Sequence, residues 1–221
     1  MTSFFRPILA SLTAALLLSP STFAFQSPLS DEAVREAYFL GQRHDEIYAR
    51  FLDKYTKHLP LPKSGPHISA ITFLTPFAQL TQYSNRVIPN YSAQQATLDH
   101  RNQKEIVQIT IKILLTESYG PLMVSPANDA THSAASLVPR PSNFWKDFDV
   151  QVFDGENSLD PSSFDGHPDS HCGKGSSCSL YGATIVLEFP AESFESSDAT
   201  VDITIPDGQH VTTTFNLSSL R

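Results

Sequence analysis

The chain has 221 residues, of which 40% are hydrophobic and 17% charged, and its formal net charge is −8. Residues 25–146 carry twelve Lys/Arg and ten Asp/Glu, a net of +2, whereas residues 147–221 carry two Lys/Arg and thirteen Asp/Glu, a net of −11. Because an acidic surface repels phosphate backbones, we expect no nucleic acid partner.

The N-terminus has the pattern of an export signal. Arg6 precedes the apolar run ILASLTAALLLS at residues 8–19, and small residues at Thr22 and Ala24 suit a signal-peptidase site. We therefore expect residues 1–24 to be a signal peptide and the mature chain to begin at Phe25. The run is shorter than the roughly 20 apolar residues that span a bilayer. The sequence thus predicts an exported protein, periplasmic or extracellular, with no transmembrane segment after cleavage.

Residues 25–66 are predicted to form an N-terminal helical segment followed by a proline-rich connector. Ser30 can cap a helical region at 31–57, and acidic residues in its first turn suit the positive end of the helix dipole. Apolar residues recur there at three- and four-residue spacing, and Gly41 interrupts them, which indicates two helices. The connector LPLPKSGP, residues 59–66, ends this region.

Residues 67–221 are predicted to form one β-sandwich domain, because apolar and polar residues alternate along most of this stretch. The Asp207-Gly208 pair between two alternating runs predicts a hairpin over residues 199–217. The sequence Ser-Ala-Gln-Gln at 92–95 can cap a short helix. The other expected strands lie at residues 68–75, 77–83, 105–115, 144–153 and 180–189.

This pattern predicts a mainly β fold, an antiparallel β-sandwich that is Ig-like in general architecture and carries an N-terminal helical segment. A β-barrel is the alternative. Residues 117–143 read as a long irregular connection rich in Pro, Ser and Ala, and about 25 residues before the strand at 180–189 read as a second, acidic one.

Side chains that could bind a metal or form a disulfide are most concentrated in DGHPDSHCGKGSSC, residues 165–178, which includes the only two cysteines of the sequence. Zinc could take His167, Asp169 and His171, but Pro168 breaks any helical ligand spacing and a loop gives no fixed geometry. Cys172 and Cys178 enclose only small residues and Lys174, and exported proteins meet oxidising conditions, so the sequence favours a disulfide.

The acidic loop at 154–171 also offers oxygen ligands to a cation, beginning with DGENSLD at 154–160. The glycine and the bidentate glutamate of an EF-hand loop are missing, so an exposed acidic loop is the favoured interpretation.

Catalytic motifs are absent from the sequence. It has no G-x-S-x-G elbow, no H-E-x-x-H, no P-loop and no G-x-G-x-x-G after a strand. We therefore assign no catalytic, cofactor-binding or metal residues and expect no cofactor.

Three segments resemble uncharacterised exported proteins of acidobacteria. They are PLSDEAVREAYFLGQR at 28–43, FLDKYTKHLPLPKSGPH at 51–67 and PDGQHVTTTFNLSSLR at 206–221. The resemblance implies a bacterial envelope setting. That family has no assigned activity, so the resemblance implies no residue roles.

The sequence as a whole favours an exported envelope protein that acts as a non-catalytic binding, assembly or structural module, with an envelope protein or polymer as its partner. The alternative is an exported hydrolase or metal-dependent enzyme whose histidines and carboxylates come from distant parts of the chain. A concave pocket with converging His and carboxylate groups would favour the enzyme, whereas an exposed edge strand or apolar patch would favour the module.

Overall fold

The computed structural model of the protein describes residues 24–86, 91–125, 134–173 and 178–221. Nearly all of the predicted signal peptide lies outside these residues. Ala24 and Phe25 are both buried in the core, and the Phe25 ring lies 6.4 Å from that of Phe194. Phe25, the residue expected to begin the mature chain, is therefore an anchor for the N-terminal segment.

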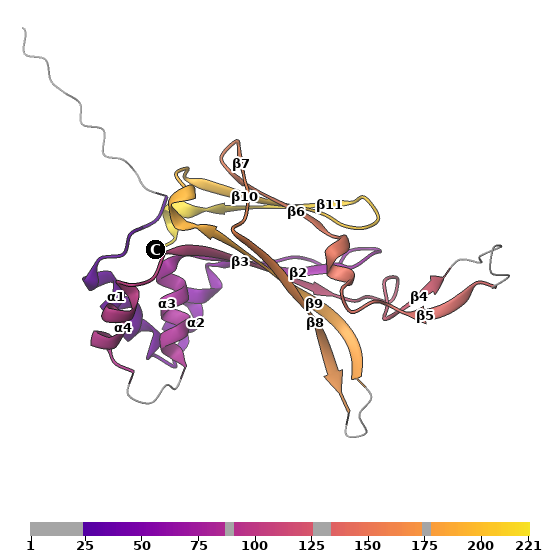
Figure 1. The fold of residues 1–221 in the computed structure, drawn as a ribbon, viewed down its shortest axis with the longest axis horizontal. Helices are drawn as coiled ribbons and strands as arrows, with labels where there is room; N and C mark the ends of the chain where they lie inside the picture. Colours follow the sequence, from indigo (N-terminus) through magenta and orange to yellow (C-terminus); the bar gives the residue numbers. More distant parts are fainter. Residues whose placement is uncertain (1–23, 87–90, 126–133, 174–177) are drawn as a thin grey trace, which may run out of the picture.

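Two antiparallel sheets form the body of the protein (Figure 1). The five-stranded sheet has the order β1 (Thr56–His58), β2 (His67–Leu74), β3 (Ile106–Leu114), β9 (Cys178–Pro190) and β8 (Ser163–Cys172). The four-stranded sheet has the order β11 (His210–Asn216), β10 (Asp198–Thr204), β6 (Asp149–Asp154) and β7 (Asn157–Leu159).

The apolar faces of the two sheets meet in one core. Alternate residues of β3 are fully buried, as their period-two pattern predicts, and the facing residues of β9 and β10 are buried with them. Four aromatic rings join the sheets: Phe73 of β2 packs against Phe215 of β11 at 5.5 Å and against Phe194 at 5.2 Å, and Phe189 packs against Phe194 at 5.8 Å. This arrangement confirms the predicted sandwich.

The sheets do not close into a barrel, so the alternative fold is wrong. Within the described residues, β1 and β8 are the outer strands of the first sheet and β11 and β7 those of the second.

The C-terminal hairpin is confirmed, although its turn differs from the two-residue loop that Asp207-Gly208 suggests. The Ile205 N–H donates to Gln209 O, and the Gly208 N–H donates to Ile205 O, so three residues lie between the last paired positions. Gly208 has φ of 85°, the left-handed conformation that such a loop demands at its last position. Alternate residues of the two strands face the core: Val201, Ile203, Ile205, Thr213 and Phe215 are buried, and Val211 is half-buried.

Four helices gather at one end of the sandwich (Figure 1). They are α1 (Asp31–Gly41), α2 (Glu46–Asp53), α3 (Pro76–Asn85) and α4 (Ala93–His100). Ser30 caps α1 by accepting from the Ala33 N–H, and Ser92 caps α4 by accepting from the Gln95 N–H, as predicted.

Gly41 ends α1, as the sequence indicates, and it does so for a packing reason. A Cβ atom there would lie 2.3 Å from the carbonyl oxygen of Thr81, because α1 and α3 approach each other closely at this point. Only glycine leaves room for that contact.

The strand predicted at 77–83 is wrong, because these residues form α3. Thr75 accepts from the Ala78 N–H as the N-cap, and Pro76 occupies the first turn, where its missing N–H is not needed. The region predicted to be β-sandwich therefore contains α3 as well as the short helix expected after Ser92, and α3 and α4 join α1 in a second apolar cluster.

The end of the chain is held between the helices and the sheets. The Tyr55 hydroxyl donates to Arg221 O at 3.2 Å and accepts from the Arg221 N–H at 3.0 Å. The Thr75 hydroxyl also donates to Arg221 O, and the Arg221 guanidinium pairs with Glu36 of α1.

Two connections contain more regular structure than the sequence indicates, and one predicted strand starts later than expected. Residues 117–143 include a two-stranded arm of β4 (Leu122–Ser125) and β5 (Ser136–Pro139). The acidic stretch before β9 includes β7 and β8. The predicted strand at 144–153 begins as the 3₁₀ turn η1 (Phe144–Asp147), and two further 3₁₀ turns are η2 (Ala191–Ser193) and η3 (Leu217–Ser219).

Candidate functional site

The predicted disulfide is present. Cys172 and Cys178 are joined with a Cα–Cα distance of 4.0 Å, and they form the last pair of the β8–β9 register. This corrects the expectation of a stapled irregular loop, because the bond closes the far end of a long hairpin that extends beyond the sandwich (Figure 1). The residues between Gly173 and Cys178 lie outside the described parts of the chain.

The candidate metal residues do not converge into a site. His167 Nε2 and Asp169 Oδ1 lie 3.8 Å apart, and the Asp169 carboxylate also accepts from the Thr184 hydroxyl at 3.0 Å. The register shifts after Asp169, where Tyr181 of β9 is the extra residue, and His171 lies beyond this bulge near the tip of the hairpin. Nowhere in the described residues do three His, Cys, Asp or Glu side chains form a group that could hold a metal ion.

Asp154, the first residue of the acidic loop, has a structural role in the sandwich. Its buried carboxylate accepts from the N–H groups of Glu195 and Ser196 and from the Ser196 hydroxyl, all at 3.0–3.1 Å. Both oxygens are therefore occupied by the turn that leads into β10. The remaining acidic residues of the 154–160 loop are exposed.

The β4–β5 arm projects from the end of the sandwich opposite the helices (Figure 1). Its register pairs Leu122 with Pro139 and Val124 with Leu137, which puts these four side chains on one face. Leu122, Val124 and Leu137 are 54%, 64% and 67% exposed. The arm therefore presents a continuous apolar face to solvent.

Arg140 fixes the base of the arm. Its backbone N–H donates to Pro121 O at 2.7 Å, and its Nε donates to Gly120 O at 2.8 Å. The guanidinium lies 3.5 Å above the centre of the Tyr119 ring, which in turn packs against Phe144 in the core. These contacts join the arm to the body at a defined point.

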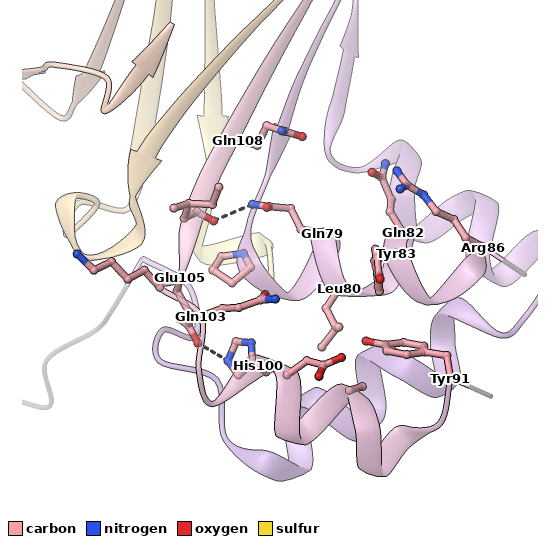
Figure 2. A pocket seen from close by; sticks show the side chains of 15 residues that line it. Gln79, Leu80, Gln82, Tyr83, Arg86, Tyr91, His100, Gln103, Glu105 and Gln108 are labelled. Carbon is pink, nitrogen blue, oxygen red and sulfur yellow. Dashed lines mark hydrogen bonds and ion pairs between the residues drawn. The ribbon is translucent and has the colours of Figure 1, made fainter. Parts of the chain in front are cut away.

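A groove of about 550 Å³ lies at the helical end, between α3, α4 and the start of β3. Its walls combine glutamine amides, tyrosine rings and a few charged groups. Figure 2 shows the Tyr91 phenol and the Gln103 side chain directed into the same open space. The amide, phenol and carboxylate groups of its lining include those of Gln79, Gln82, Tyr83, Tyr91, Asp99 and Gln103.

Tyr83 and Tyr91 form the aromatic part of the groove. Their rings meet edge to face with centroids 5.3 Å apart, and Tyr83 remains 43% exposed. Burial, followed by the Asp99 carboxylate and neighbouring phenols, raises the pKa of Tyr91 to about 12. The Tyr91 hydroxyl therefore stays neutral across the physiological range, able to donate and to accept hydrogen bonds.

A histidine–carboxylate pair closes the bottom of the groove. His100 Nε2 lies 2.8 Å from Glu105 Oε1, and both side chains are largely buried. Glu105 also accepts from the Ser27 hydroxyl at 2.6 Å and from the Leu29 N–H at 2.5 Å. This pair ties α4 and the N-terminal segment to the start of β3.

The hydrogen bonds to Glu105 decide its charge. Burial favours the neutral acid, but the bonds from His100, Ser27 and Leu29 together favour the carboxylate more strongly. The pKa of Glu105 therefore lies below its ordinary value of 4.5.

Comparison with known proteins adds no functional assignment. No family model matches the chain, and no curated protein matches it at a significant level. The resemblance to exported acidobacterial proteins stays a prediction.

None of the groove residues is singled out by a sequence motif. Amides and phenols spread over residues 79–108 converge only after α3 and α4 fold against β3. The Thr75-Pro76 start of α3 and the Ser92 cap of α4 are local signals for the helices of its walls, but neither marks a binding site.

Proposed function

We propose that the protein is an exported, non-catalytic binding module of the cell envelope that attaches to a partner protein through the apolar face of the β4–β5 arm. The observation that carries this proposal is the exposure of Leu122, Val124 and Leu137 on one face of a projecting ribbon. A two-stranded hairpin is at best marginally stable alone in water. Contiguous exposed apolar residues are typical of protein contact surfaces.

The base of the arm supports the same proposal. The contacts of Arg140 with Pro121, Gly120 and Tyr119 set the direction of the ribbon, so that its apolar face is presented in one orientation. A preset surface loses less conformational entropy on binding than a loop that must first become ordered. Because both strands of this sheet are edges, a partner strand can also add to its backbone groups.

The export part of the proposal is supported by the disulfide, which forms and persists in oxidising compartments. No helix in the described residues is long and apolar enough to cross a membrane. The charge-poor arm and the acidic C-terminal half also favour a protein contact over an anionic lipid or nucleic acid surface.

Site-specific photo-crosslinking in the producing cells tests the proposal. A photoreactive residue at position 124 or 137 is expected to yield one discrete protein adduct. The matched control is position 61, because Leu61 is 71% exposed and lies in the β1–β2 connection. Adducts at position 61 as abundant as those at 124 and 137 would contradict the proposal, as would their absence from the arm.

A second measurement uses the double variant Val124→Asn/Leu137→Asn. Buried apolar anchors of an interface are worth about 2 kcal/mol or more each, so the loss of both should weaken partner binding by roughly 700-fold or more. The same variant should melt at the wild-type temperature, because neither side chain contributes to the core.

One observation favours the alternative of a hydrolase, namely the His100–Glu105 pair inside a groove. Glu105, however, already receives hydrogen bonds from Ser27 and Leu29, which suits a structural clamp. Hydrolysis of a glycoside or ester by the purified protein that is lost in His100→Ala but kept in Tyr181→Ala would favour the enzyme.

A further inference from the structure

The groove at the helical end is separate from the arm. Figure 1 shows the helices and the β4–β5 arm at opposite ends of the molecule, so occupation of one leaves the other open. Its volume of about 550 Å³ lies within the range of sites that hold small molecules or short chain segments.

The charges of the groove balance. Arg86 and Lys104 contribute two positive groups, and Asp99 and Glu105 contribute two negative ones. Glu105 is further committed to His100 at 2.8 Å. A ligand of high charge would face an opposing group on the same wall, so the groove fits a neutral polar ligand better than an anion or a cation.

The walls of the groove offer both hydrogen-bond donors and acceptors, which suits a ligand with many hydroxyl groups because each hydroxyl can donate and accept. Both N–H groups of Gln79 are used, because its Nε2 donates to Leu74 O at 3.0 Å and to Ile106 O at 2.7 Å. The Gln79 Oε1 is thereby held as an acceptor. Gln82 and Gln103 add amides that can donate and accept, and Asp99, which accepts from Gln95 at 2.6 Å on Oδ1, has a second oxygen.

The aromatic wall supplies the complementary apolar contact. Tyr83 is 43% exposed and is supported edge to face by Tyr91, with Leu80 beside them in the lining. A pyranose ring has a C–H face that packs on an aromatic ring and hydroxyls at its rim that hydrogen-bond to amides and carboxylates. The tyrosine rings therefore suit the C–H face of a sugar, and the fixed polar groups beside them suit its hydroxyls.

We propose that the groove between α3, α4 and the start of β3 binds a neutral oligosaccharide, with Tyr83 against a sugar face and Gln82, Gln103 and Asp99 on its hydroxyls. The groove is open to solvent, so a segment of a longer glycan can enter without a chain end. This makes an envelope polysaccharide a second partner, independent of the protein that contacts the arm.

The test is calorimetric titration of the purified full chain with cellohexaose, maltohexaose and chitohexaose. At least one of these neutral hexasaccharides is expected to bind at micromolar to millimolar concentration. Tyr83→Ala should reduce the affinity by tenfold or more, whereas Tyr83→Phe, which keeps the ring, should stay within about threefold of wild type. Gln103→Ala removes one neutral hydrogen bond and should weaken binding by about two- to tenfold.

Tyr181→Ala is the matched control, because Tyr181 is a 46% exposed tyrosine on β9, outside the groove. It should bind like the wild type, and equal melting temperatures across the set would show that all variants are folded. No binding of any of the three sugars at millimolar concentration would overturn the proposal. So would equal weakening in Tyr181→Ala, or selective binding of polygalacturonate or a peptide in place of the neutral sugars.

Discussion

Replacement of Phe215 by alanine should cost more stability than most single substitutions in this chain. Phe215 is 1% exposed and lies on β11 with its ring 5.5 Å from that of Phe73 across the two sheets. Truncation of a buried phenylalanine costs about 3–5 kcal/mol in free energy of unfolding, since it removes apolar contact and leaves a cavity. Loss of the aromatic pair is included in that figure.

Urea unfolding followed by circular dichroism measures the effect. With a urea dependence of about 2 kcal/mol per molar, the midpoint of Phe215→Ala should fall by about 1.5–2.5 M. Phe39→Ala is the control, because the same side chain is 62% exposed on α1 and should change the stability by less than about 1 kcal/mol.

The cross-sheet contact can also be isolated. In a double-mutant cycle, Phe73→Ala and Phe215→Ala should be non-additive by about 0.5–3 kcal/mol, because the two rings touch. If Phe215→Ala unfolds at the same urea concentration as Phe39→Ala, the hairpin of β10 and β11 is peripheral and the sandwich described above is refuted.

Three further predictions concern polar and covalent contacts. The free energy of unfolding of the double variant Cys172→Ser/Cys178→Ser should be lower by about 2 kcal/mol, because the disulfide no longer restricts the unfolded chain. Hydrogen exchange should become faster at the tip of the β8–β9 hairpin but not in β3, and faster exchange in β3 would contradict a local role of the disulfide. The pKa of Glu105 is lowered in the native state, so the stability that the ionised Glu105 contributes is present above pH 4.5 and is lost as the pH falls through the native pKa. Glu105→Gln should therefore lose less stability in acid than the wild type does. An unchanged dependence of stability on acid pH would contradict the structural role of the Glu105 carboxylate. Asp154→Ala should destabilise the protein by about 2–3 kcal/mol in urea unfolding, because the Ser196 N–H loses its acceptor, and a wild-type midpoint would exclude that role.

The inner strands of the two sheets could be predicted from the sequence, because each pairs with a neighbour on both sides and buries one of its faces in the core. In β3, strict alternation of β-branched and polar residues fixed which side chains face the core, and Val107, Ile109 and Ile111 are indeed fully buried. The helix caps at Ser30 and Ser92 could also be predicted, because each cap depends on one local hydrogen bond from the backbone to the serine side chain.

The two strands of the arm and the long strand β8 could not be predicted in this way. Along β8 nearly every residue is exposed or half-exposed, so no apolar alternation marks it, and its pairing depends on backbone hydrogen bonds to β9. The stretch 77–83 was wrongly predicted although its pattern is not that of a strand. Phe77, Leu80 and Tyr83 recur at three-residue spacing, which is typical of a helix, and the Thr75 cap and the burial of Phe77 agree with it.

The groove was beyond sequence reasoning because nothing local marks it. Gln79 and Tyr83 lie on α3, Tyr91 precedes α4, and Gln103 follows α4. Amides and phenols at such positions are ordinary surface residues in a sequence. Only the folding of α3 and α4 against β3 brings them together.

The bonds between Tyr55 and Arg221 also constrain the order in which the protein can be completed. A ribosome adds Arg221 long after Tyr55, since 166 positions separate the two. Until then the hydroxyls of Tyr55 and Thr75 lack the acceptor that joins the helices to the sheets. The helical end and the sheets can therefore be joined at this point only after Arg221 has been synthesised, which makes this contact a late step of folding.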